Sequence, residues 1–128
     1  MSQTAQWLLF SRGQQNFALS AEALVCQLSA FAWAVLPDTS SGVVGLFNFA
    51  GEALPLLDMA AVGGELAEAA SNCLVIDIDE QHQLGLLSDE VAELTDIVPE
   101  HEQIMIGGRD YQLLMVHTLK QYLLEEGH

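Results

Sequence analysis

The sequence predicts a mostly β fold made of short antiparallel strands, with one short helix near the C-terminal end. Two observations carry this prediction. Short apolar runs recur along the chain, and turn segments rich in Gly, Asn, Asp or Pro separate them. Apolar side chains at helical spacing are clear only in residues 119–126. Close alternation of strands and turns is typical of small antiparallel barrels.

The first half of the chain contains two predicted hairpins. Its expected strands are residues 6–10, 16–19, 24–28, 43–49 and 53–57. Ser20 is placed to cap a helical turn at residues 21–23, and residues 50–52, with a central glycine, turn the second hairpin. Residues 31–35 are apolar throughout, so periodicity does not decide between a strand and a buried loop. Residues 36–42 are expected to form a loop.

The second half contains two more predicted hairpins. They follow a connector at residues 59–70, which is expected to be a turn and then weakly helical because Gly63-Gly64 interrupts its alanines. The expected strands are residues 74–79, 83–87, 91–97, 104–106 and 111–116. Residues 80–82 turn the first of these hairpins and Gly107-Gly108 turn the second.

Composition excludes several classes of function. The chain has 128 residues, which predicts one domain, and 18 acidic residues against three basic ones give a net charge of −15. Nucleic acids and anionic lipids are bound by Lys and Arg, so neither is an expected partner. No apolar stretch reaches the roughly 20 residues that a membrane span needs. We therefore expect a cytoplasmic protein that does not insert into the membrane.

Asp77 and Asp79 are the strongest candidates for chemistry. Side chains two apart on a strand project from one face, and paired carboxylates can serve acid–base catalysis or bind a hard cation. A small acid-residue or metal-dependent hydrolase is therefore the alternative from a different class. No third ligand is identifiable, and the four histidines lack metal-ligand spacing. A solvated acidic face is favoured, with no cofactor, no metal and no enzymatic activity.

The order of the segments is more informative than any one of them. Along nearly its whole length the chain resembles the CheW-like domain family, the coupling proteins of bacterial chemotaxis. The segments that carry the resemblance are Trp7 to Phe10, Val25 to Leu28, Leu36-Pro37, Gly45 to Gly51, Pro55 to Met59, Gly85 to Val91 and Tyr111 to Leu124. Each segment alone is weak, and the ordered set is fairly specific.

The resemblance implies a fold of two SH3-like, five-stranded β-barrel lobes that share a hydrophobic core. Lobe boundaries are expected at about residues 16–70 and 71–116, with segments 1–15 and 117–128 completing the lobes. The family's members are non-enzymatic adaptors. They couple a CheA-like histidine kinase, bound through its regulatory domain, to the helical tip of a chemoreceptor in chemotaxis or surface motility. Exposed sheet edges also permit self-association.

The resemblance also assigns protein-binding residues. Those expected on the first lobe are Val25, Gln27, Leu28, Phe49, Ala50 and Gly51, and those on the second are Gly85, Leu87 and Val91. Two of them depart from the family pattern, because Ala50 stands where the family carries Arg and Gln27 where it carries Glu. The alternative within the binding class is thus a divergent paralogue that binds only the kinase or itself.

Overall fold

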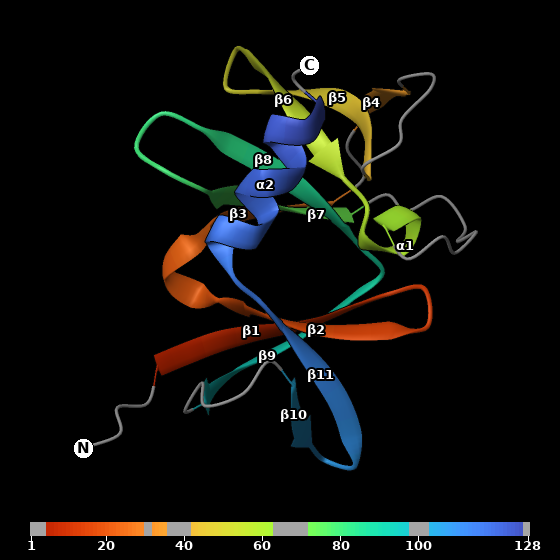
Figure 1. Cartoon of the computed structure of the whole chain (residues 1–128), viewed down its shortest axis with the longest axis vertical. Coiled ribbons are helices and arrows are strands. Elements are labelled where there is room, and N and C mark those ends of the chain that lie inside the picture. Colours follow the sequence, from red (N-terminus) through yellow and green to blue (C-terminus); the bar gives the residue numbers. More distant parts are fainter. Residues whose placement is uncertain (1–4, 30–31, 36–41, 63–71, 98–102, 127–128) are drawn as a thin grey trace.

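The strands form two sheets, one above the other, in the computed structural model, which describes residues 5–29, 32–35, 42–62, 72–97 and 103–126 (Figure 1). The first sheet has five strands in the order β10-β11-β2-β1-β9, and we call it lobe A. Its strands are β1 (Ala5–Arg12), β2 (Gln15–Ser20), β9 (Glu90–Ile97), β10 (Gln103–Ile106) and β11 (Arg109–Leu114).

The second sheet has six strands in the order β3-β7-β8-β6-β5-β4, and we call it lobe B. Its strands are β3 (Leu24–Ser29), β4 (Trp33–Val35), β5 (Val43–Phe49), β6 (Glu52–Leu57), β7 (Asn72–Asp77) and β8 (Gln83–Ser88). The helical segments are η1 (Ala21–Ala23), α1 (Met59–Val62) and α2 (Val116–Glu126), of which α2 lies along lobe B (Figure 1).

Lobe B curls into a barrel-like shape because its two edge strands are consecutive in the chain. A flat six-stranded sheet would separate its edges by about 24 Å, at roughly 4.8 Å for each strand spacing. The four residue steps from Ser29 at the end of β3 to Trp33 at the start of β4 reach at most about 14 Å. The sheet must therefore bend until β3 and β4 approach each other.

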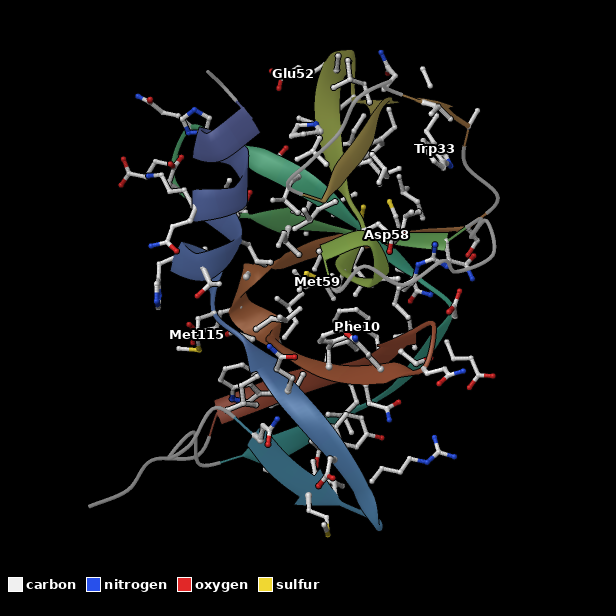
Figure 2. The ribbon with its side chains drawn as sticks, turned by 45° about the vertical axis from the view of Figure 1, so that its right-hand side comes forward. Phe10, Trp33, Glu52, Asp58, Met59 and Met115 are labelled. Carbon is white, nitrogen blue, oxygen red and sulfur yellow. The ribbon has the colours of Figure 1, made fainter. Side chains whose placement is uncertain are left out.

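The buried apolar residues of the described ranges form three clusters. One lies inside lobe A around Trp7, and a second lies inside lobe B, where side chains of both edge strands, Cys26 and Trp33, pack against the same buried residues. The largest lies between the lobes, where the rings of Phe10 and Phe17 stack with centroids 5.3 Å apart. Figure 2 shows Phe10 and Met59 facing each other in this shared core.

Strand alternation distributes neighbouring residues between these clusters. On β7, Cys73 and Val75 enter the interior of lobe B while Leu74 and Ile76 enter the shared core. Both faces of the strand are thus buried, which explains why its sequence reads as an apolar run rather than an apolar–polar alternation. The predicted mostly β fold, with two lobes sharing a core and a C-terminal helix, is confirmed.

Lobe membership differs from the predicted boundaries at 16–70 and 71–116. β2 belongs to lobe A, where it pairs with β1 and lies parallel to β11. β7 and β8 belong to lobe B, where β8 lies parallel to β6. Lobe B thus takes strands from residues 24–88, and lobe A takes strands from both sides of it. Parallel pairs between distant segments leave no turn signal in the sequence, so hairpin signals alone could not assign them.

Smaller differences have local causes. The sixth strand of lobe B is β4, within the apolar segment where periodicity was ambiguous. Ser20 precedes η1 as predicted but makes no side-chain capping hydrogen bond. α2 begins at Val116, earlier than predicted. The expected loop at 36–41 and the connector at 63–70 lie outside the described residues. Within the described residues, no helix has the length and apolar character needed to cross a membrane.

Candidate partner-binding surface

The edge strand β3 displays two of the predicted binding residues. Its side chains alternate between half-buried and exposed, and Val25 and Gln27 are on the exposed side. Val25 keeps 40% of its surface exposed, while Leu28 packs against the interior of lobe B. Within the described part of the chain β3 pairs with β7 alone, so its other edge has backbone groups open to a partner strand.

The β5–β6 turn displays two more of them. Ala50 and Gly51 have φ angles of 52° and 86° between the paired residues Phe49 and Glu52. Positive φ at both central residues defines a type I′ turn, which matches the twist of a hairpin. The Gly51 N–H donates to Oδ1 of Asn48 at 3.3 Å. Both turn residues are exposed, whereas Phe49 is half-buried and packs against the interior of lobe B.

The three binding residues predicted on the second lobe, Gly85, Leu87 and Val91, are not exposed. Gly85 and Leu87 belong to β8 in lobe B and are buried, with Leu87 only 2% exposed. A Cβ atom at Gly85 would lie 2.6 Å from the Phe47 ring, so the glycine makes room for a core side chain. Val91 is half-buried against the shared core. Gly85 and Leu87 therefore shape the interior rather than face a partner.

The outer side of β4, β5 and β6 carries apolar and uncharged side chains that sequence reasoning did not single out. The strand register places Ala34, Leu46, Asn48, Ala53 and Pro55 on this side, which we call the β4–β6 face. A shallow hollow of about 370 Å³ lies on it, lined also by Trp33. Figure 2 shows Trp33 and Glu52 at the part of lobe B that is remote from lobe A. The alternation of β5 could have indicated this face.

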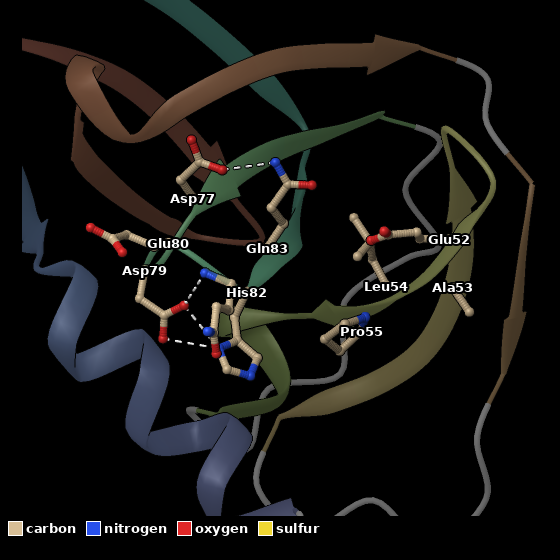
Figure 3. Close-up of a pocket in the computed structure, with 10 residues that line it drawn as sticks. Glu52, Ala53, Leu54, Pro55, Asp77, Asp79, Glu80, His82 and Gln83 are labelled. Carbon is tan, nitrogen blue, oxygen red and sulfur yellow. Dashed lines mark hydrogen bonds and ion pairs between the residues drawn. The ribbon is translucent and has the colours of Figure 1, made fainter.

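A second hollow, of about 440 Å³, lies between β6 and the β7–β8 turn (Figure 3). One wall is formed by Leu54 and Pro55, and four acidic residues line the rest of it, Glu52, Asp77, Asp79 and Glu80. We call this hollow the acidic pocket. Ala53 lines both hollows, so the acidic pocket and the β4–β6 face adjoin at β6.

Asp77 and Asp79 do not act as a pair. β7 ends at Asp77, so strand alternation does not extend to Asp79, and Figure 3 shows the two carboxylates pointing in different directions. Asp77 accepts a hydrogen bond from Gln83 at 2.8 Å. Asp79 accepts one from the Gln81 backbone at 2.7 Å and forms an ion pair with Lys120 of α2 at 2.8 Å. The predicted common face is therefore wrong.

The contacts of Asp79 explain its acidity. The hydrogen bond from Lys120, with smaller contributions from the Gln81 N–H and His82, lowers the pKa of the carboxyl group well below its usual range. His82 Nδ1 lies 2.8 Å from Oδ1 of Asp79. No group of three potential metal ligands occurs in the described ranges. These carboxylates hold a turn and a helix together, and their arrangement does not favour the hydrolase hypothesis.

The cysteines show the same lack of chemical activation. Cys73 is fully buried and Cys26, on the neighbouring strand, is half-buried; both are free thiols. Burial raises the pKa of the Cys73 thiol to about 12. Because the thiolate is the reactive form, Cys73 is inert at neutral pH.

A buried cation that sequence reasoning missed joins the two lobes. Arg12, at the end of β1, is 2% exposed. Its Nε and Nη2 donate to the two carboxylate oxygens of Asp58, both at 2.8 Å, and its Nη1 donates to Asp89 at 3.0 Å. Asp89 also accepts the Gly13 N–H, and Asp58 accepts the Ala60 N–H. We call Arg12, Asp58 and Asp89 the interlobe clamp.

The sequence could have indicated Arg12 because basic residues are rare in this chain. Only three Lys or Arg residues occur in the chain, and Arg12 lies two positions after the predicted strand at residues 6–10. Hydrogen bonding to Asp58 raises the pKa of the guanidinium further above its already high value. The bidentate geometry is the strong form of such a pair. The clamp holds the end of β1 against the end of β6 and the β8–β9 junction, so it is part of what positions the lobes.

Comparison with known proteins agrees with this architecture. The fold is similar to the crystal structure of scaffolding protein TtCheW from Thermoanaerobacter tengcongensis, with a TM-score of 0.73 and 15% sequence identity over 88% of this chain and 90% of that chain. No curated protein matches the sequence. The model of the CheW-like domain matches residues 6–112. Since this match spans most of the 128 residues, the chain belongs to the CheW-like domain family.

Proposed function

We propose that the protein is a non-enzymatic adaptor that couples a CheA-type histidine kinase to chemoreceptor-like input in chemotaxis or surface motility. Membership of the CheW-like domain family is the observation that carries the proposal. The exposed edge of β3 supports it, because an open strand edge is a common means of binding another protein. The proposal places the protein in the cytoplasm.

The binding residues of this proposal lie on lobe B. Val25 and Gln27 contact the partner directly from β3, and Ala50 and Gly51 do so from the β5–β6 turn. Leu28 and Phe49 support these positions from the interior of the lobe. Gly85, Leu87 and Val91 contribute only through packing, because they are buried or half-buried.

The test is direct binding of the purified protein to two probes by isothermal titration calorimetry. One probe is the regulatory domain of a CheA-type kinase from the same organism, and the other is a receptor-tip helical hairpin. Val25→Asp is expected to weaken binding about ten-fold, because a carboxylate would replace an apolar contact. Met105→Asp is the matched control, since it makes the same change at the exposed edge of lobe A. Failure of both probes to bind would contradict the proposal.

The second candidate is a divergent paralogue that binds only the kinase or itself. Ala50 and Gln27 favour it, because an uncharged turn and an uncharged amide stand where the family carries Arg and Glu. This candidate predicts kinase binding without receptor binding in the same titrations. Sedimentation velocity of the protein alone reports self-association, which is expected to increase with salt because each copy carries a charge of −15.

A further inference from the structure

The β4–β6 face and the acidic pocket adjoin at Ala53 and differ in character. Leu46 is 38% exposed on the face. No charged side chain lines the hollow on this face. The residue next to Ala53 on β6 is Glu52, which lines the acidic pocket, and Asp77 and Glu80 line it from the other side. An apolar strip thus leads into a negatively charged hollow.

Lys120, paired with Asp79, is the one cation of the described residues known to neutralise a carboxylate of that hollow. Of the chain's three Lys and Arg residues, Arg12 is buried in the interlobe clamp and Lys120 is paired with Asp79. Arg109 lies on the β10–β11 hairpin of lobe A, at the opposite end of the molecule from the β5–β6 turn (Figure 1). No described cation pairs with Glu52, Asp77 or Glu80. A complementary charge has to come from another molecule.

We propose that this surface binds an extended segment of another protein, in which an apolar side chain occupies the β4–β6 face and a neighbouring Lys or Arg enters the acidic pocket. Pro55, half-buried on β6, provides an apolar contact for the methylene stem of that side chain, and Glu52, Asp77 and Glu80 receive its charged end. A second copy of this chain does not fit, because it would bring the same acidic groups and a charge of −15.

This inference deepens the proposed function, on which it rests for the claim that the partner is a protein. Its test uses a synthetic peptide, so that its outcome is independent of any kinase or receptor. The probe is acetyl-Ser-Val-Ser-Leu-Ser-Arg-Ser-Lys-Ser-amide, whose apolar and basic side chains share one face of an extended strand. Binding is followed by NMR titration of the ¹⁵N-labelled protein. We expect shifts confined to the amides of β4, β5, β6 and residues 77–83.

Two matched pairs of variants test the two halves of the surface. Glu52→Gln/Asp77→Asn/Glu80→Gln is expected to weaken peptide binding about ten-fold, the loss of roughly 1.4 kcal/mol. The control Glu22→Gln/Glu90→Gln/Asp110→Asn removes the same charge from exposed residues elsewhere and is expected to leave binding within two-fold. Leu46→Ser is expected to weaken binding, whereas Met115→Ser, at a residue of similar exposure between β11 and α2, is not.

A peptide with Glu in place of its Arg and Lys is expected not to bind. Equal losses in both charge variants would overturn the proposal, because they would show only attraction to an acidic protein. Shifts outside the named segments, or no shifts, would overturn it as well. If the peptide binds as expected while kinase and receptor probes fail, the proposed function is wrong and this inference stands. If a kinase or receptor probe binds while the peptide does not, this inference is wrong and the proposed function stands.

Discussion

Ala50 adopts a conformation that costs an alanine free energy. It has a φ of 52°, and it is the only non-glycine residue with positive φ in the described ranges. Left-handed backbone costs an L-residue with a Cβ atom roughly 1–2 kcal/mol, and Asn tolerates it better. We expect Ala50→Asn to stabilise the protein by about 0.5–1 kcal/mol in urea denaturation, and Ala50→Val to destabilise it. Ala53→Asn, in the adjacent strand, is the control, and an equal gain there would contradict the turn argument.

Asp79 provides a second prediction at the residue scale. Its pKa is lowered in the folded state, so its ionised form stabilises the fold above the unfolded pKa of about 3.8, and this contribution is lost as the pH falls through the lower folded value. Lys120→Met should move the Asp79 titration up toward 3.8 and make stability less dependent on pH in that acid range. Lys120→Arg should retain much of the shift. NMR titration of the Asp79 carboxyl carbon measures both, and an unmoved midpoint in Lys120→Met would exclude the Lys120 contact as the main cause.

The packing of β8 against Phe47 of β5 depends on the lack of a side chain at Gly85. A Cβ atom at Gly85 would lie 2.6 Å from one ring carbon of Phe47 and 3.1 Å from Leu56, and Phe47 is itself only 3% exposed. Gly85→Ala is therefore expected to cost about 1–3 kcal/mol through overpacking. In a double-mutant cycle measured by chemical denaturation, Gly85→Ala should cost less when Phe47 is already Leu. Additive losses would show that the ring is not the obstacle.

The interlobe clamp operates at the scale of the whole molecule, because it joins elements of both lobes. Arg12→Met leaves Asp58 buried without its cation, which should cost about 3–5 kcal/mol of unfolding free energy. Arg12→Met/Asp58→Asn/Asp89→Asn should recover part of that loss, since no uncompensated charge stays buried. Arg109→Met, at an exposed position, is the control and should change stability by less than about 0.5 kcal/mol. Equal losses in the single and triple variants would show that packing, rather than charge pairing, accounts for the effect.

The sequence predicted what is encoded locally. Hairpins such as β5–β6 and β7–β8 combine apolar runs with turn residues, and both were predicted in the correct places. Lobe membership could not be predicted in this way, because it depends on the parallel pairs β6–β8 and β2–β11 between distant segments. The ordered resemblance to a family supplied the two-lobe fold where local patterns could not.

The candidate site was predicted less completely. Val25, Gln27, Ala50 and Gly51 are exposed as a binding surface requires. Gly85 was predicted on the partner surface but is buried. The sequence around a glycine flanked by apolar residues does not distinguish an exposed turn from a tightly packed core. Arg12 was missed for a different reason. Its partners Asp58 and Asp89 are 46 and 77 positions away in the chain, beyond the reach of any spacing rule.

The order of the strands along the chain also determines when each lobe can be completed during synthesis on the ribosome. All strands of lobe B lie within residues 24–88, whereas lobe A needs β1 and β2 from before that range and β9 to β11 from after it. The β1–β2 hairpin therefore emerges early, with Trp7, Leu9 and Ala18 facing no interior until β11 has been made. Lobe B can fold in the meantime, because its strands are contiguous in the chain. The first apolar surface available to the β1–β2 hairpin is therefore that of lobe B, which the hairpin contacts through Phe10 and Phe17.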